Sequence, residues 1–159
     1  MYNASAPAQN APDAPNAADV ARLVLQTLGP MSQLKLQKLV YYCQAASMAW
    51  RNRPIFADRI EAWANGPVVR SLWQANRYRS WVEADNMADG DVNRLSEVNR
   101  QDVMAVIEAY GTRDGGDLSG QTHTEHPWLA AREGFEPGQA CNRPISLDSM
   151  ASYYREAWG

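Results

Sequence analysis

Lysine is almost absent from this chain. Lys35 and Lys38 are the only two lysines, whereas arginine occurs thirteen times. A compact ammonium on a flexible stem is not equivalent to a planar guanidinium, so the two residue types are not interchangeable at a specific contact. Both lysines fall within one octapeptide, residues 35–42, which reads KLQKLVYY. This segment is therefore the first candidate for a region where a specific contact requires lysine.

Cysteine and histidine are also scarce, with two of each. Cys43 and Cys141 are too few for a disulfide framework, and the composition favours two free thiols in a reducing compartment. No run approaches the roughly 18 apolar residues of a membrane span, and the N-terminus lacks the basic start and apolar middle of a secretory signal. We expect a cytoplasmic protein with no membrane partner.

The first fifteen residues have a different composition from the rest. They are rich in Ala, Pro, Asn and Gln, with prolines at positions 7, 12 and 15. Such a segment has too little bulky apolar surface to offset the entropy lost on ordering. We predict a disordered Ala/Pro-rich tail over residues 1–15 and one domain over residues 16–159, a length that suffices for one sizeable core.

Charge is distributed unevenly around a net value of −3. Residues 31–80 hold eight basic and two acidic side chains, whereas residues 81–159 hold six basic and fourteen acidic ones. Either the two halves fold against each other and neutralise, or a basic face meets an acidic partner or a phosphate backbone. The acidic total favours the first interpretation and makes nucleic acid an improbable partner.

Periodicity predicts a mainly α fold. Apolar positions recur at helical spacing up to residue 28, and Asn16 or Asp19 can cap that helix. A second helix over 32–50 is apolar on nearly every side from Leu39 onward, which predicts a central position. Further helices are expected over 67–76, with proline first, over 96–110 with Met104 inward, briefly over 127–133, and from Ser146 onward.

The remaining segments are expected to be loops and one strand. Residues 59–63 alternate well enough for a short strand, the only β element predicted. Residues 79–95 read as a polar surface loop anchored by Trp81, and Gly115-Gly116 as a hinge. The sum is a single compact helical domain with at most a short β element around residues 59–63.

Three ordered blocks of residues accompany the lysine segment. They are Glu61-Ala62-Trp63 with Gly66-Pro67-Val68-Val69, then Leu118-Ser119 with Thr122-His123, then Pro127-Trp128 with Ala131-Arg132. Together with KLQKLVYY, these blocks resemble the Panacea domain, the SocA/GepA-like family. The likeness runs from about residue 20 to residue 154.

The resemblance implies a function in protein binding. Many proteins of that family are antitoxins, encoded beside a toxin in bacteria, phages and prophages, that neutralise the toxin by direct association without a cofactor. One relative, SocA, is a proteolytic adaptor that delivers its toxin to a Clp protease. A toxin-binding protein is therefore the leading hypothesis, with a proteolytic adaptor or a nucleic-acid-binding regulator acting through the basic half as alternatives.

Two sets of residues are candidates for the functional site. Aromatic and cationic side chains dominate binding hot spots, and the expected partner contacts are Lys35, Lys38, Tyr41, Trp63, Arg70 and Trp128. Residues expected to support the motif structurally are Leu36, Gln37, Leu39, Gly66, Pro67, Thr122, His123 and Pro127. Trp63 can instead fill the core, and the two lysines can form a solvated face or bind a carboxylate of the acidic half or of a partner.

An enzyme is the weakest hypothesis. His123 and His126 with Cys141 can be read as an incomplete zinc site, but the spacing of known zinc motifs is missing. No Gly-rich phosphate loop, Gly-x-Ser-x-Gly or protease signature is present. We expect His123 to dock its loop by satisfying backbone groups, with no catalytic role.

Overall fold

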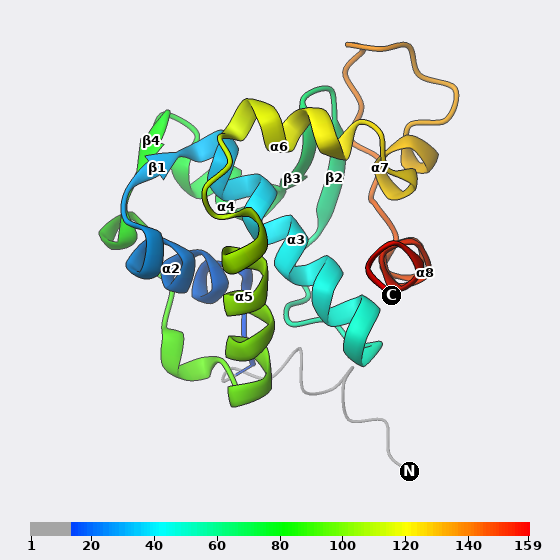
Figure 1. Ribbon diagram of the computed structural model, residues 1–159. Coiled ribbons are helices and arrows are strands. Elements are labelled where there is room, and N and C mark those ends of the chain that lie inside the picture. Colours follow the sequence, from blue (N-terminus) through cyan, green and yellow to red (C-terminus); the bar gives the residue numbers. More distant parts are fainter. Residues whose placement is uncertain (1–13) are drawn as a thin grey trace.

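The computed structural model describes residues 14–159, so residues 1–13 of the predicted tail lie outside the described part. The described residues form helices with two small antiparallel sheets, which confirms a mainly α fold (Figure 1). The α-helices are α2 (Ala17–Leu28), α3 (Gln33–Arg51), α4 (Arg70–Asn76), α5 (Glu97–Tyr110), α6 (Gly115–Thr122), α7 (His126–Ala131) and α8 (Leu147–Trp158). The strands are β1 (Met31–Ser32), β2 (Ile60–Trp63), β3 (Gly66–Val69) and β4 (Trp81–Val82), and two 3-10 turns cover Ala84–Asn86 and Val92–Arg94.

Helix α3 lies at the centre of the molecule. Every residue from Leu36 to Ala49 is buried, as its apolar character on all sides predicts. The helix contacts α2, α5, α6 and α8, and Figure 1 shows α2 and α8 on opposite sides of it. The Ser32 hydroxyl accepts the Lys35 amide at 3.1 Å, and Asn52 ends the helix in the left-handed region. The core is thus organised around one helix.

Side-chain caps place the ends of the other long helices. Asn16 caps α2 and forms a capping box with Asp19, Ser96 caps α5, and Ser146 caps α8. These starts agree with the sequence predictions. The prediction that Met104 faces inward is wrong: 43% of it is exposed, because the neighbouring Val103 and Val106 fill the inner face of α5.

The short β element is larger than the sequence predicts. Strand β2 confirms the strand expected at residues 59–63, but residues 66–69 form β3, which pairs antiparallel with it. The predicted helix start at Pro67 is wrong, because the Val69 backbone is extended and α4 begins at Arg70. Pairing with β2 and with side chains from α3 outweighs the local preference of proline for a helix start.

Two loop predictions also change. Gly115-Gly116 is the start of α6, where the Asp114 side chain caps the helix by accepting the Asp117 amide. Trp81 does not anchor its loop: its side chain is 63% exposed, and the buried neighbours Val82 and Met87 hold that segment. No helix within residues 14–159 is both long and apolar enough to span a membrane.

Candidate functional site

Lys35, the first lysine of the motif, forms a hydrogen bond with the end of another helix. The Lys35 ammonium donates to the Gly111 carbonyl at 2.7 Å, at the C-terminus of α5. A cation opposes the dipole at the start of its own helix but is favourable at the C-terminus of another. Lys35 therefore ties α3 to α5 through a helix cap, where the sequence suggested a carboxylate. Leu36 and Leu39 are buried in the core beside it.

Gln37 and Lys38 attach α3 to the backbone of β3. The Gln37 side chain accepts the Val69 amide at 2.7 Å and donates to the Val69 carbonyl at 3.3 Å. The Lys38 ammonium donates to the Pro67 carbonyl at 3.1 Å. Two successive side chains of the helix thus pair with backbone groups that a further strand would otherwise bind.

Gly66 is fixed by the same contact. Its φ is +114°, a region that side chains rarely adopt, and a Cβ there would lie 2.6 Å from Lys38 Cε and 2.9 Å from Thr122 Oγ1. Thr122 is itself buried, with its hydroxyl donating to the Ser119 carbonyl at 2.6 Å. The glycine, the lysine and the threonine of the motif therefore pack on one another, which explains their occurrence together.

Lys38 is an unusual lysine, because it is buried without a carboxylate. Its exposure is 1%, and it forms no ion pair within residues 14–159. Desolvation of the ammonium lowers the pKa of Lys38 to about 7.

The aromatic end of the motif surrounds a buried carboxylate. Tyr42 and Tyr154 each donate to Oε1 of Glu125 at 2.7 Å, and Gln121 donates to its other oxygen at 3.1 Å. The Tyr41 hydroxyl lies 3.0 Å from that of Tyr154 and must donate to it, since Tyr154 gives its proton to Glu125. Burial raises the pKa of all three tyrosines, so they stay protonated.

Two of the expected partner contacts, Tyr41 and Trp128, lie inside the fold. Tyr41 is completely buried, so its side chain offers no surface to another protein. Trp128 is also mostly inside, with 6% exposed, and its indole nitrogen donates to the Trp63 carbonyl at 2.8 Å. Both residues are part of the scaffold that holds the site.

His123 docks α6 onto the β2–β3 hairpin. Its Nε2 lies 2.9 Å from the Ala64 carbonyl and its Nδ1 faces the Ser119 carbonyl. Both ring nitrogens therefore face backbone carbonyls, and at least one of them donates its proton. No group of three or more potential metal ligands occurs within residues 14–159. The buried Pro127 occupies the first turn of α7 next to it.

Arg132 stabilises the loop after α7. The sequence analysis named it only as part of the last motif block. Only 5% of it is exposed, and its guanidinium donates to three backbone carbonyls, those of Ala62, Glu136 and Gln139. A single arginine thus joins β2 to the loop after α7. No periodicity or spacing distinguishes it from a surface arginine.

Arg70 and Trp63 meet at Glu61. The buried Glu61 accepts Trp63 Nε1 at 2.7 Å, Arg59 Nε at 2.7 Å and Arg70 Nη1 at 3.3 Å. Burial alone would raise the pKa of Glu61, but these hydrogen bonds and the two arginine charges hold it below its usual value. Both arginine side chains are about half exposed, so the ion pairs lie at the surface.

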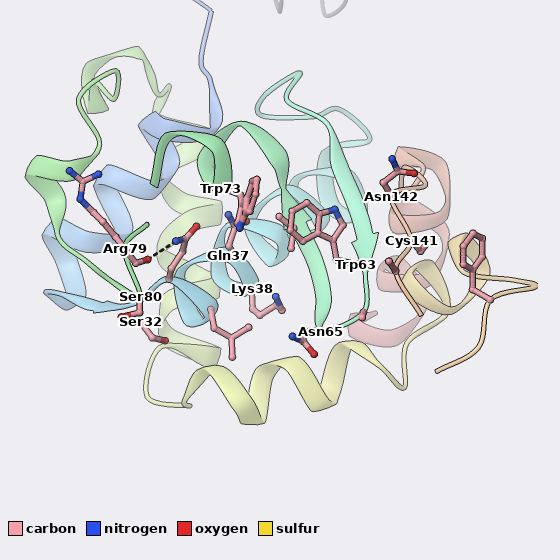
Figure 2. A pocket seen from close by; sticks show the side chains of 16 residues that line it. Ser32, Gln37, Lys38, Trp63, Asn65, Trp73, Arg79, Ser80, Cys141 and Asn142 are labelled. Atoms are coloured by element: carbon pink, nitrogen blue, oxygen red, sulfur yellow. Dashed lines mark hydrogen bonds between the residues drawn. The ribbon is translucent and has the colours of Figure 1, made fainter. Parts of the chain in front are cut away.

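A pocket of about 960 Å³ opens between α3, the β2–β3 hairpin, α4 and the loop after α7 (Figure 2). Trp63 and Trp73 form one wall, with ring centroids 5.0 Å apart in an edge-to-face arrangement. Among the residues of the described part of the chain that line it, Lys38 and Arg79 are the charged ones, and none is acidic. We call this cavity the Lys38 pocket.

The six expected partner contacts therefore do not form one surface. Lys38 and Trp63 line the Lys38 pocket, Arg70 is linked to Trp63 through Glu61, Tyr41 and Trp128 are internal, and Lys35 binds α5. The sequence analysis did not select Trp73 or Arg79, and it considered Cys141 only as a zinc ligand, yet all three line the pocket. Trp73 follows the Gly-Pro block at helical spacing, and that spacing was the available signal.

One comparison with known proteins gives a match. The family described as "Antitoxin SocA-like, Panacea domain" matches residues 36–129, more than half of the chain. That segment spans most of α3, the hairpin, α4, α5 and α6, and part of α7. The chain matches no curated protein and no solved structure at a significant level.

Proposed function

Because this chain belongs to the SocA-like antitoxin family that carries a Panacea domain, we propose that it neutralises a cognate toxin by direct protein–protein binding. The Lys38 pocket carries this proposal, since it is a large, mainly apolar concavity walled by two tryptophans. Buried aromatic residues and arginines supply most of the free energy at protein interfaces. Trp63, Trp73 and the half-exposed Arg70 place such residues together on one face.

The surroundings of the pocket support a rigid binding surface. Trp63 is held by Glu61, by Trp128 through its carbonyl, and by its contact with Trp73. Side chains that are already fixed lose little further entropy on binding. A surface of this kind suits obstruction of a toxin over a typical interface of about 1,600 Å² in total.

The side chains of the types that commonly support catalysis have other roles here. His123 contacts backbone carbonyls with both nitrogens. Cys43 is enclosed in the core, where burial and the nearby Asp102 raise the pKa of its thiol. This placement favours a binding function over an enzymatic one.

The basic half of the sequence is partly neutralised within the fold. Arg51 pairs with Asp102 at 3.0 Å, Arg59 and Arg70 share Glu61, and Lys35 caps α5. Fewer cations are therefore available for phosphates than the sequence suggests, which supports a protein partner over nucleic acid.

Co-expression with the product of the adjacent gene tests the proposal. We expect the chain to restore growth and to co-purify with that product. Trp73→Ala should weaken both effects, because it removes one wall of the pocket. Tyr78→Ala is the matched control: Tyr78 is an 88% exposed aromatic residue close in sequence but outside the pocket lining. A toxic product that is neither neutralised nor bound would refute the proposal.

Delivery of the toxin to a Clp protease is an alternative outcome of the same binding. It predicts that the half-life of the toxin shortens when the chain is co-expressed and returns to normal in a strain lacking the protease. Neutralisation by obstruction predicts an unchanged or longer half-life.

A further inference from the structure

We propose that the Lys38 pocket receives a carboxylate carried on an apolar segment of the partner protein, with the Lys38 ammonium as its cation. The inference rests on the proposed function and names the chemistry of the segment that is bound. Four observations carry it: the unpaired charge of Lys38, the sign of the other charges, a buried Gln33 oxygen without a donor among the described residues, and the apolar lining of the same pocket.

The Lys38 ammonium has unused hydrogen-bonding capacity. It carries three N–H donors, and within residues 14–159 its one hydrogen-bond partner is the Pro67 carbonyl. Although only 1% of Lys38 is exposed, the residue lines the pocket, and Figure 2 shows its amine end flanked by Trp63 and Asn65. A buried charge without an opposite charge is unfavourable, so an incoming carboxylate gains from pairing with it.

The charges around the pocket select an anion. No acidic side chain of residues 14–159 belongs to the lining, and the other charged lining residue, Arg79, donates from its guanidinium to Asn76 Oδ1 at 3.3 Å. No carboxylate of residues 14–159 forms an ion pair with the Lys38 ammonium, and burial lowers the pKa of this lysine. A carboxylate from outside would supply the missing charge.

Gln33, which lines the pocket, also has a buried oxygen without a hydrogen-bond donor among the described residues. Gln33 donates its amide nitrogen to the carbonyls of Asn76 at 2.8 Å and Arg79 at 2.7 Å, which fixes the orientation of the amide. Its Oε1 is buried and has no donor among the described residues. A peptide can offer an N–H to Gln33 as well as a carboxylate to Lys38, whereas a simple anion can satisfy only the lysine.

The remaining surface requires an apolar carrier. Trp63, Trp73, Val68 and Phe135 line the same pocket as Lys38. A phosphate backbone would leave these walls uncovered and would meet few positive charges. The combination fits an acidic residue adjacent to an aromatic or aliphatic one in the partner.

Binding of the purified toxin to three forms of the chain tests the pocket. We expect Lys38→Met to raise the dissociation constant by about 30-fold or more, because it removes one member of a buried charge pair. Lys35→Met is the matched control, since Lys35 lies one turn away on α3 and binds Gly111 outside the pocket. It should alter the dissociation constant by less than about twofold. Thermal melting of each variant checks that it is folded.

A titration with small probes tests the pocket independently of any toxin. With only two lysines, a chain labelled with ¹³C at the lysine ε-carbons gives two NMR signals, and Lys38→Met assigns them. N-acetyl-L-tryptophan at millimolar concentration should shift the Lys38 signal and leave that of Lys35 in place. N-acetyl-L-tryptophanamide, which lacks the carboxylate, should shift neither.

The outcomes separate the two proposals. If the wild-type chain binds no toxin, the proposed function fails, and the Lys38 shift still decides whether the pocket recognises carboxylates. If the chain binds toxin and Lys38→Met binds equally tightly, the present inference is overturned while the proposed function stands. A Lys38 signal that the acid leaves unmoved, or that acid and amide move equally, also overturns it.

Discussion

The Lys38 side chain is almost fully buried, and its aliphatic stem packs against Gly66. A lysine in this setting destabilises the folded chain relative to an apolar residue of similar length, because the charged form is desolvated. A binding function would explain the presence of a lysine that lowers stability at this position. Stability and binding should therefore respond to Lys38 in opposite directions.

Lys38→Met should change how stability depends on pH. Burial lowers the pKa of Lys38 from 10.5 to about 7, so between these values the unfolded chain binds more protons than the folded one. The free energy of unfolding of the wild type then rises with pH by up to about 1.4 kcal/mol per pH unit from this group. We expect Lys38→Met to be more stable at pH 6, and its advantage to shrink by roughly 2–3 kcal/mol by pH 9. Urea unfolding of both proteins at pH 6 and 9 measures this, and a constant difference would contradict it.

Gly66→Ala tests the contact between the hairpin and the motif helix. The added Cβ would clash with Lys38 Cε and Thr122 Oγ1 in a backbone conformation that alanine rarely adopts. We expect the free energy of unfolding to fall by about 1–3 kcal/mol. Gly120→Ala is the control: Gly120 lies in α6, a Cβ there meets nothing within 4 Å, and the change should be neutral or stabilising by up to about 1 kcal/mol. Equal effects of the two substitutions would refute this account of Gly66.

At the scale of elements, α3 acts on the hairpin as an additional strand would. Gln37 binds both backbone groups of Val69, and Lys38 binds the carbonyl of Pro67. These contacts keep residues 66–69 extended until α4 begins at Arg70. The position of the pocket wall therefore depends on side chains of a neighbouring helix.

Gln37→Met should loosen β3 locally. It leaves the amide and carbonyl of Val69 without side-chain partners, and each unpaired buried group costs about 1–3 kcal/mol. We expect the Val69 amide to exchange with deuterium much faster than in the wild type, while amides in the middle of α5 keep their relative protection. Gln101→Met, at an exposed position of α5, is the control. Unchanged protection at Val69 would show that β2 alone holds the strand.

At the scale of the whole molecule, one buried carboxylate joins distant parts of the chain. Glu125 lies just before α7 and binds Tyr42 of α3 and Tyr154 of α8. Helix α8 lies beyond the family match at residues 36–129 but packs extensively on α3. The C-terminal helix is therefore an integral part of the domain core.

Tyr154→Phe should destabilise the entire domain. It removes one donor from the buried Glu125 and leaves the Tyr41 hydroxyl without its acceptor. Hydrogen bonds to charged groups contribute about 1.5–3 kcal/mol, so we expect a loss of that size in the free energy of unfolding. The adjacent Tyr153→Phe is the control, since no hydrogen bond of the Tyr153 hydroxyl occurs within residues 14–159, and its effect should stay within about 0.5 kcal/mol. Far-UV circular dichroism and tryptophan fluorescence should report the same transition if the domain unfolds as one unit.

Local sequence determined the helical frame of this protein. The apolar residues around α3 predicted its central place, and the caps at Ser32, Ser96 and Ser146 set helix starts because capping involves only neighbouring residues. The ordered motif blocks were also enough to indicate the family. These features depend on periodicity or on contacts within a few residues.

Only the tertiary structure decided where the motif side chains go. The second strand at residues 66–69 forms because Gln37 and β2 bind its backbone, and Tyr41 is internal because it meets Tyr154 from the far end of the chain. Lys38 lines a pocket because α3, the hairpin and α4 converge around it. Such placements arise from contacts between residues distant in sequence, which spacing and composition do not encode.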